Sequence, residues 1–191
     1  MGMKMKRCAC MKVEYKIAYG NEKIVFIKSG AGGNASGYKN KYICMAQRIH
    51  DRLGATVICS SNPDMPHEKS DEAAIRRIVS EKSFSDFEVY FIGISDGAYQ
   101  NLLLAKRFPE TVKLVGINTS FIDISDFEER LRALPDVHKV LIYGTEDDDF
   151  DEIAPMLSEM TCDKLELKFV DGADHSFTGM PEELIALADY L

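Results

Sequence analysis

The sequence EVYFIGISDGAYQNLLLAKRF, residues 88–108, decides the fold of this chain. Its first seven residues are a nearly continuous apolar run, which is typical of a strand that is buried on both faces. The run ends in a turn that contains Gly93 and Gly97, and a helix is expected over 97–107. A buried strand that leads directly into a helix is the repeating unit of α/β proteins.

The same alternation of strand and helix continues on both sides of this stretch. Towards the N-terminus, an alternating pattern from Met11 and a turn at Gly20-Asn21 predict a strand hairpin that enters a buried strand over 23–30. The other expected strands cover 55–61, 112–118, 139–144 and 165–170, and the other expected helices cover 38–53, 70–82, 124–134, 151–160 and 181–191. Apolar strands separated by amphipathic helices require a sheet that is covered on both faces. The expected fold class is therefore α/β, with an open, doubly wound and mostly parallel sheet.

Length and composition limit what the chain can be. With 191 residues and no long linker, it is expected to form one domain over 11–191, and residues 1–10 are interpreted as a disordered extension. Lys and Arg number 23 against 31 Asp and Glu, and this net charge of -8 has the wrong sign for binding nucleic acid. No apolar stretch approaches the roughly 18 residues of a membrane span. The five cysteines are odd in number and lack C-x-x-C spacing, which indicates a reducing, cytoplasmic compartment.

A G-x-S-x-G pattern lies at the turn between this strand and this helix, with Ser95 at its centre. Such a turn holds a serine in strained backbone geometry with its hydroxyl projecting from the sheet edge. A β-carbon at Gly93 or Gly97 would crowd the neighbouring strand or helix. The pattern therefore suits a nucleophilic serine, although a serine that caps the following helix would produce the same five residues.

Two later strand ends supply the residue types that a nucleophilic serine needs. The strand over 139–144 is followed by Thr-Glu-Asp-Asp-Asp, and the strand over 165–170 by Asp-Gly-Ala-Asp-His. An imidazole can accept the serine proton, and a carboxylate can fix the tautomer of that imidazole. Because the carboxyl ends of parallel strands share one sheet edge, these residues are expected to converge there.

In these three segments the chain resembles the α/β-hydrolase family, over nearly all of residues 13–191. GISDG resembles the nucleophile elbow of the family, YGTEDD the segment that carries its acid, and GADHSF the loop that carries its histidine. In the family the acid stands three residues after a glycine, which from Gly144 selects Asp147. The resemblance implies Ser95 as nucleophile, Asp147 as acid and His175 as base. It implies no cofactor.

The acid belongs to a run in which six of the seven residues from Glu146 to Glu152 are acidic. Carboxylates at the start of the helix over 151–160 favour its positive end, and their spacing does not match a calcium loop, so no metal is predicted. If the strand boundary is displaced, Asp148 or Asp149 would replace Asp147 as the acid.

The loop SGAGGNASG, residues 29–37, follows the first buried strand. In a hydrolase, the backbone N–H of Ala31 would join that of Asp96 as the oxyanion hole. Family members often carry His-Gly where this chain has Ser29-Gly30. The loop also satisfies the dinucleotide pattern G-x-G-x-x-A, but the next strand then lacks the ribose-binding acid and ends in Ser-Ser-Asn.

The expected function is that of a small serine hydrolase that cleaves a carboxylic ester or thioester through an acyl-enzyme. About 20 residues, 119–138, occupy the position where the family usually inserts a lid, so no cap domain is expected and the site is open. Met65 and Pro66 are expected to line the acyl pocket.

The expected partner is a small-molecule acyl substrate, with no nucleic acid and no membrane, and no oligomeric state is predicted. The alternative is a binding protein that keeps the fold without turnover. The complete triad argues against that alternative, and two residues keep it open: Ser29, where the family often has histidine, and Asp96, whose carboxylate adjoins the nucleophile.

Overall fold

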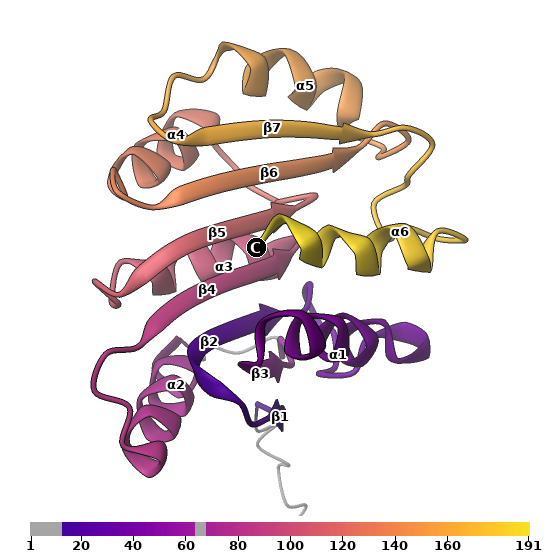
Figure 1. Cartoon of the computed structure of the whole chain (residues 1–191). Helices are drawn as coiled ribbons and strands as arrows, with labels where there is room; N and C mark the ends of the chain where they lie inside the picture. The colour runs from indigo at the N-terminus through magenta and orange to yellow at the C-terminus, as the bar shows by residue number, and fades with distance from the viewer. Residues whose placement is uncertain (1–12, 64–67) are drawn as a thin grey trace, which may run out of the picture.

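The computed structural model describes residues 13–63 and 68–191. The predicted extension over 1–10 and the expected pocket residues Met65 and Pro66 lie outside this part of the chain. A seven-stranded sheet has the order β1-β3-β2-β4-β5-β6-β7 (Figure 1). The strands are β1 (Tyr15–Ala18), β2 (Asn21–Lys28), β3 (Ala55–Ser60), β4 (Glu88–Ile94), β5 (Thr111–Ile117), β6 (His138–Gly144) and β7 (Leu165–Val170). All neighbours pair in parallel except β1 and β3. The predicted class, a mostly parallel α/β sheet, is confirmed.

Helices cover both faces of this sheet. They are α1 (Lys41–Leu53), α2 (Glu68–Lys82), α3 (Asp96–Ala105), α4 (Ile124–Arg132), α5 (Phe150–Glu159) and α6 (Pro181–Ala186), with short 3-10 turns at Tyr38–Asn40 and Leu187–Tyr190. Strand β2 shows how the faces divide. Val25 and Ile27 pack in one core with α1 and α6, whereas Ile24 and Phe26 pack in the other with α2 to α5. Because successive side chains of a strand point to opposite faces of the sheet, one strand contributes to two separate cores.

The predicted hairpin at Gly20-Asn21 is wrong. Strand β1 pairs antiparallel with β3, which separates it from β2. The chain crosses the start of β3 at this turn: the Asn21 N–H donates to the Gly54 carbonyl at 2.7 Å. A β-carbon on Gly20 would lie 2.2 Å from the same oxygen. Because β2 is apolar on both faces, it takes a central position, and the more exposed β1 becomes the edge strand.

The carboxyl ends of the parallel strands lie along one edge of the sheet. Ser95 follows β4, Asp147 lies in the loop after β6, and His175 lies in the loop after β7. Strands β4, β5, β6 and β7 are consecutive in the sheet, so these loops emerge side by side (Figure 1). Within the described part of the chain, no helix has both the length and the apolar character needed to cross a membrane.

Candidate active site

Ser95 has a strained backbone at the turn between β4 and α3. Its φ is 55° and its ψ is -128°, in a region that residues with a side chain rarely adopt. The two glycines of the motif permit this turn through close backbone packing. A β-carbon on Gly93 would lie 2.2 Å from Ala98 Cα, and one on Gly97 would lie 2.2 Å from the Ser29 carbonyl oxygen. The predicted need for both glycines is confirmed.

The Ser95 hydroxyl does not cap α3, although the residue occupies the N-cap position. Its Oγ lies 3.0 Å from His175 Nε2, and His175 Nδ1 lies 2.7 Å from Asp147 Oδ2. Because an ionised carboxylate accepts hydrogen bonds and cannot donate them, Nδ1 carries the imidazole proton. Nε2 is then the acceptor for the Ser95 O–H. The structure thus brings the three predicted residues into one hydrogen-bonded chain.

Burial differs along this chain of hydrogen bonds. The Asp147 side chain is 8% exposed, whereas that of His175 is 46% exposed. A buried carboxylate fixes the orientation and tautomer of the imidazole, and the exposed face of the imidazole is accessible to substrate and water. Asp148 and Asp149 are exposed, and Asp149 stands at the N-cap of α5 instead. Among the three candidates for the acid, Asp147 is the one that contacts His175.

The loops that carry Asp147 and His175 pack directly on one another. A β-carbon on Gly144 would lie 2.1 Å from the Ala173 carbonyl oxygen, so glycine is required where these loops meet. The Glu146 N–H donates to that same oxygen at 2.9 Å. Asp174 folds the histidine loop back on itself, because its Oδ1 accepts the N–H groups of Ser176 and Thr178. These bonds, that from Thr178 above all, lower the pKa of the Asp174 carboxyl.

Asn118 joins the same two loops and was missed by the sequence analysis. Its side chain is buried, and its Oδ1 accepts the Gly144 N–H at 2.8 Å. Its Nδ2 donates to the carbonyls of Asp174 at 3.2 Å and His175 at 2.9 Å. The signal was an asparagine that directly follows the apolar strand β5 at the carboxyl edge of the sheet.

Ser120 was also missed, because residues 119–138 were considered for their length alone. Its Oγ lies 3.0 Å from Ser95 Oγ, and the residue is exposed. A cavity of about 440 Å³ opens beside it. Residues that line this cavity come from the start of α3, from the segment before α4 and from the first turn of α4, and they include Asp96, Tyr99, Ser120, Phe121, Asp123 and Asp126. The cavity therefore begins at Ser120, and its lining contains both aromatic and acidic side chains.

The two residues predicted for the oxyanion hole come from different segments: Ala31 lies in the loop after β2, and Asp96 directly follows Ser95. Gly30, which precedes Ala31, packs against it: a β-carbon on Gly30 would lie 3.3 Å from Ser95 Cβ. Asp96 is the first residue of α3, so its N–H has no acceptor within the helix. Ser29 is buried, and its Oγ donates to backbone carbonyls, that of Gly33 at 3.0 Å among them. Ser29 therefore shapes the loop.

Comparisons with known proteins agree on the fold. No family model matches the chain, and neither does any curated protein. Among solved structures, an α/β serine hydrolase homologue from Coxiella burnetii superposes with a TM-score of 0.67 at 18% identity, over 92% of this chain and 89% of that one. Est1E from Butyrivibrio proteoclasticus gives 0.68 at 13% identity, over 96% and 94%. An α/β serine hydrolase without lid from Xanthomonas campestris gives 0.63 at 17% identity, over 93% and 87%. At these identities the likeness shows the fold alone.

Proposed function

From the α/β-hydrolase fold of this chain, we propose that it is a serine hydrolase that cleaves a carboxylic ester or thioester through an acyl-enzyme. The observation that carries the proposal is the continuous chain of contacts from Asp147 through His175 to Ser95, at 2.7 Å and 3.0 Å. Ser95 has a positive φ, and its hydroxyl forms a hydrogen bond with the imidazole and does not cap α3. An activated serine nucleophile needs this arrangement.

Acylation begins when Ser95 Oγ forms a bond to the carbonyl carbon of the substrate. His175 Nε2 takes the hydroxyl proton as the bond forms, and Asp147 stabilises the imidazolium. The carbonyl π electrons move onto the oxygen, which receives hydrogen bonds from the N–H groups of Ala31 and Asp96. The bond to the leaving group then breaks, and His175 donates its proton to the departing alcohol or thiol.

Deacylation repeats these steps with water as the nucleophile. Water gives one proton to His175 Nε2 while its oxygen bonds to the acyl carbon. The Ser95 ester bond breaks, and His175 returns the proton to Ser95 Oγ. One water is consumed, and a carboxylic acid and an alcohol or thiol are produced. The exposed face of His175, with 46% of its side chain accessible, supports direct entry of that water.

The cavity beside Ser120 supports a substrate of modest size. Its volume is about 440 Å³, and it begins at the hydroxyl that lies 3.0 Å from Ser95 Oγ. Pockets for small molecules are typically of this size. Tyr99 and Phe121 offer aromatic contact, and the carboxylates of Asp96, Asp123 and Asp126 disfavour negative groups. A neutral or cationic substituent on the ester suits this cavity.

The test is labelling of the purified protein with a fluorophosphonate probe, alongside turnover of short-chain p-nitrophenyl esters. Ser95→Ala and His175→Ala should abolish labelling, whereas Ser158→Ala, which removes an exposed hydroxyl on α5, serves as the matched control. Labelling of wild type and control that is lost in both site variants supports the proposal. A folded wild type that neither reacts nor turns over ester would instead favour the binding protein without catalysis.

A further inference from the structure

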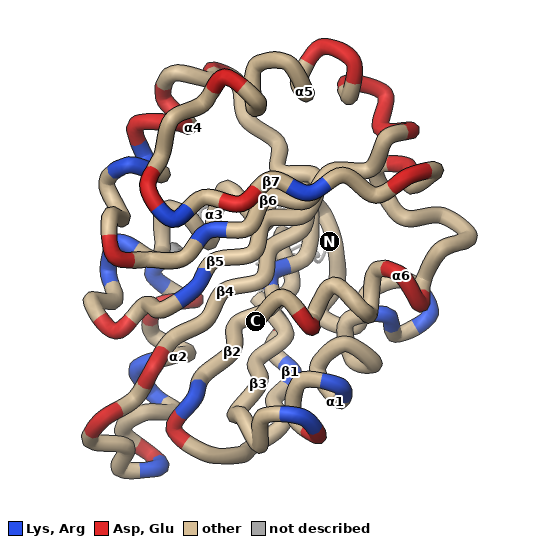
Figure 2. The backbone as a smooth tube through the Cα atoms, turned by 45° about the horizontal axis from the view of Figure 1, so that its top comes forward, with Lys and Arg blue, Asp and Glu red and all other residues tan. Residues whose placement is uncertain are grey.

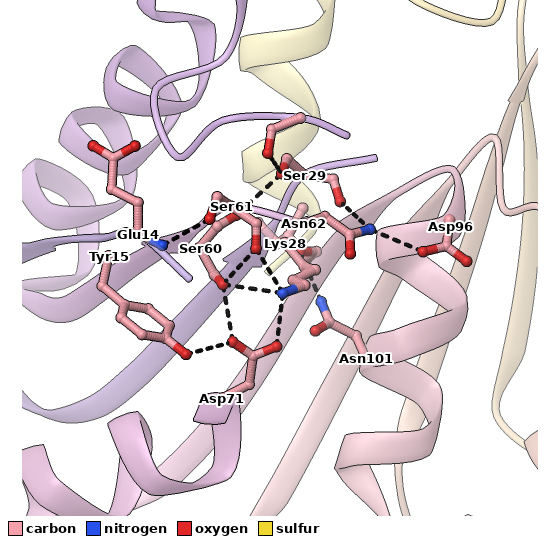
Figure 3. Close-up of polar contacts among 12 residues, drawn as sticks. Glu14, Tyr15, Lys28, Ser29, Ser60, Ser61, Asn62, Asp71, Asp96 and Asn101 are labelled. Atoms are coloured by element: carbon pink, nitrogen blue, oxygen red, sulfur yellow. Dashed lines mark hydrogen bonds and ion pairs between the residues drawn. The ribbon is translucent and has the colours of Figure 1, made fainter. Parts of the chain in front are cut away.

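Ser60, Ser61 and Asn62, at the end of β3, belong to a buried polar network next to the site (Figure 3). Asn62 is 2% exposed, and its Nδ2 donates to the Ser29 carbonyl at 3.1 Å and to Asp96 Oδ2 at 2.9 Å. These two bonds, here called the Asn62 bridge, connect the loop after β2 to the first residue of α3.

The backbone of Asn62 holds the same loop from the other side. Its N–H donates to the Gly33 carbonyl at 2.9 Å, and its carbonyl accepts the Gly32 N–H at 2.8 Å. Asn62 therefore bonds the loop before and after Ala31. Asn62 thus contributes to the position of the Ala31 peptide relative to α3 through both its side chain and its backbone.

Beneath the bridge, a buried ion pair fixes the end of β3. Lys28 is fully buried, and its Nζ donates to Asp71 Oδ2 at 2.7 Å, to the Ser61 carbonyl at 2.7 Å and to Ser60 Oγ at 3.1 Å. Tyr15 donates its hydroxyl to the other carboxylate oxygen of Asp71 at 2.8 Å. Burial lowers the pKa of Lys28, and the nearby Asp71 carboxylate opposes that shift. Moving the segment 60–62 would take the oxygens of Ser60 and Ser61 away from the buried Lys28 ammonium, so these bonds hold the segment in place beneath Asn62.

We infer that Asn62 is a positioning residue for the oxyanion hole, because its bridge fixes the separation between the two halves that carry the Ala31 and Asp96 N–H groups. The inference rests on the function proposed above. The bridge also holds the Asp96 carboxylate against the Asn62 amide at 2.9 Å. Donors aimed at a developing oxyanion contribute through their fixed position, so a displaced donor reduces kcat.

A purely structural role for Asn62 makes a different prediction. Loss of a buried amide would lower the stability of the protein and leave the kinetic constants of the folded molecules unchanged. A displaced oxyanion hole would instead lower kcat with little change in KM, because the donors act mainly in the transition state. It would also weaken binding of a trifluoromethyl ketone, whose tetrahedral adduct with the serine carries a negative oxygen.

The experiment compares Asn62→Ala and Asn62→Asp with Thr111→Val, which removes a buried hydroxyl at the amino end of β5. For p-nitrophenyl acetate, we expect kcat to fall about 10- to 100-fold in both Asn62 variants, with KM within about threefold of wild type. The inhibition constant of the ketone should rise with the loss of kcat/KM. Thr111→Val should lose stability and keep its kcat.

A double variant tests the bond itself. In Asn62→Asp with Asp96→Asn, donor and acceptor exchange places across the 2.9 Å contact. We expect this pair to recover at least fivefold in kcat over Asn62→Asp. If the Asn62 variants do not fold, Asp96→Ala and Asp96→Asn test the same bond from its other side. The side-chain amide in Asp96→Asn still offers an oxygen that accepts from Asn62, whereas Asp96→Ala offers none. The alanine variant should then be at least fivefold slower than the asparagine variant.

The outcomes separate the two proposals. A wild type that neither turns over ester nor reacts with fluorophosphonate overturns the proposed function, and the role of Asn62 with it. An active wild type whose folded Asn62→Ala variant keeps kcat within about threefold overturns the Asn62 inference alone. The same holds if the double variant is no faster than Asn62→Asp, or if the two Asp96 variants have equal kcat.

Discussion

At the scale of single residues, the candidate site depends on side chains that hold loops as much as on the three that would react. Asn118 shows this most clearly, because its amide makes all of its bonds to the backbone of the acid and histidine loops. It gives the β6 loop and the β7 loop a fixed relation to each other. The distance of 2.7 Å between Asp147 and His175 depends on that relation.

We therefore predict that Asn118→Ala lowers kcat about 10- to 100-fold, because a shift of about 1 Å between reacting groups can reduce the rate 100-fold. The measurement is the rate of fluorophosphonate labelling together with ester turnover. Asn21→Ala is the matched control, since this exposed asparagine lies at the opposite end of the sheet, where its amide bonds the Leu53 carbonyl. Equal labelling rates for both variants would contradict the role of Asn118.

Asp174 gives a prediction with a defined pH range. Its pKa is lowered in the folded protein by N–H groups that it accepts, first that of Thr178. A carboxyl whose folded pKa is depressed stabilises the protein above its unfolded pKa, and that stabilisation is lost as pH falls through the lowered value. We expect Asp174→Ala to melt below wild type at pH 7 and the difference in Tm to shrink below about pH 4. A difference that stays constant down to pH 3 would contradict this assignment.

The three residues of the candidate triad could be located from the sequence because each follows a segment that reads as a strand, and parallel strands carry such positions to one edge. The contacts of the supporting residues Asn62, Asn118 and Ser120 could not be located in this way. Their contacts link loops that are distant in sequence: Asn62 bonds Ser29 and Asp96. Such contacts depend on the register and order of strands, which no local pattern encodes.

At the scale of secondary-structure elements, most boundaries were predicted within one or two residues, and the error lies in how two elements pair. The turn at Gly20-Asn21 exists, yet it connects β1 and β2 across the start of β3. A short turn between apolar runs usually joins paired strands. Here β2 pairs in parallel with β3 on one side and with β4 on the other, so β1 cannot pair with it.

The contact between β2 and α2 leads to a prediction about stability. Lys28 and Asp71 form an ion pair with side chains 0% and 3% exposed. Removing the ammonium alone takes the positive charge out of a buried ion pair, which typically costs about 3–5 kcal/mol. We expect Lys28→Met to reduce the free energy of unfolding in urea by about that amount, and Lys28→Met with Asp71→Leu to reduce it by less. A double variant as unstable as the single one would contradict this account.

At the scale of the whole molecule, charge is unevenly balanced. The chain carries a net charge of -8, and Figure 2 shows Asp and Glu gathered around α5, near the acid loop. Asp151 and Glu152 lie in the first turn of that helix. Of the acidic residues that line the cavity, Asp126 is paired with Arg130 at 2.6 Å. Because the Asp96 and Asp123 carboxylates line the same cavity, we expect a negative field there.

This field predicts discrimination between substrates by charge. A neutral p-nitrophenyl acyl ester should have a kcat/KM several-fold above that of a p-nitrophenyl ester of similar size that bears a carboxylate on its acyl group. The ratio should decrease as salt rises from about 0.01 M to 0.5 M, because screening shortens the reach of the carboxylates. An anionic ester that reacts as fast as the neutral one at low salt would show that the cavity beside Ser120 does not hold the acyl group.

The central claim is that Ser95 becomes acylated during turnover, and rapid-quench mass spectrometry tests it most directly. Mixing the protein with p-nitrophenyl acetate and quenching in acid should reveal an adduct of one acetyl group, mapped by peptide analysis to Ser95. Release of p-nitrophenolate should show a burst that approaches one equivalent if deacylation is the slower step. A burst of p-nitrophenolate with no acetyl group on the protein, or an acetyl group on another residue with Ser95 unmodified, would contradict acylation of Ser95.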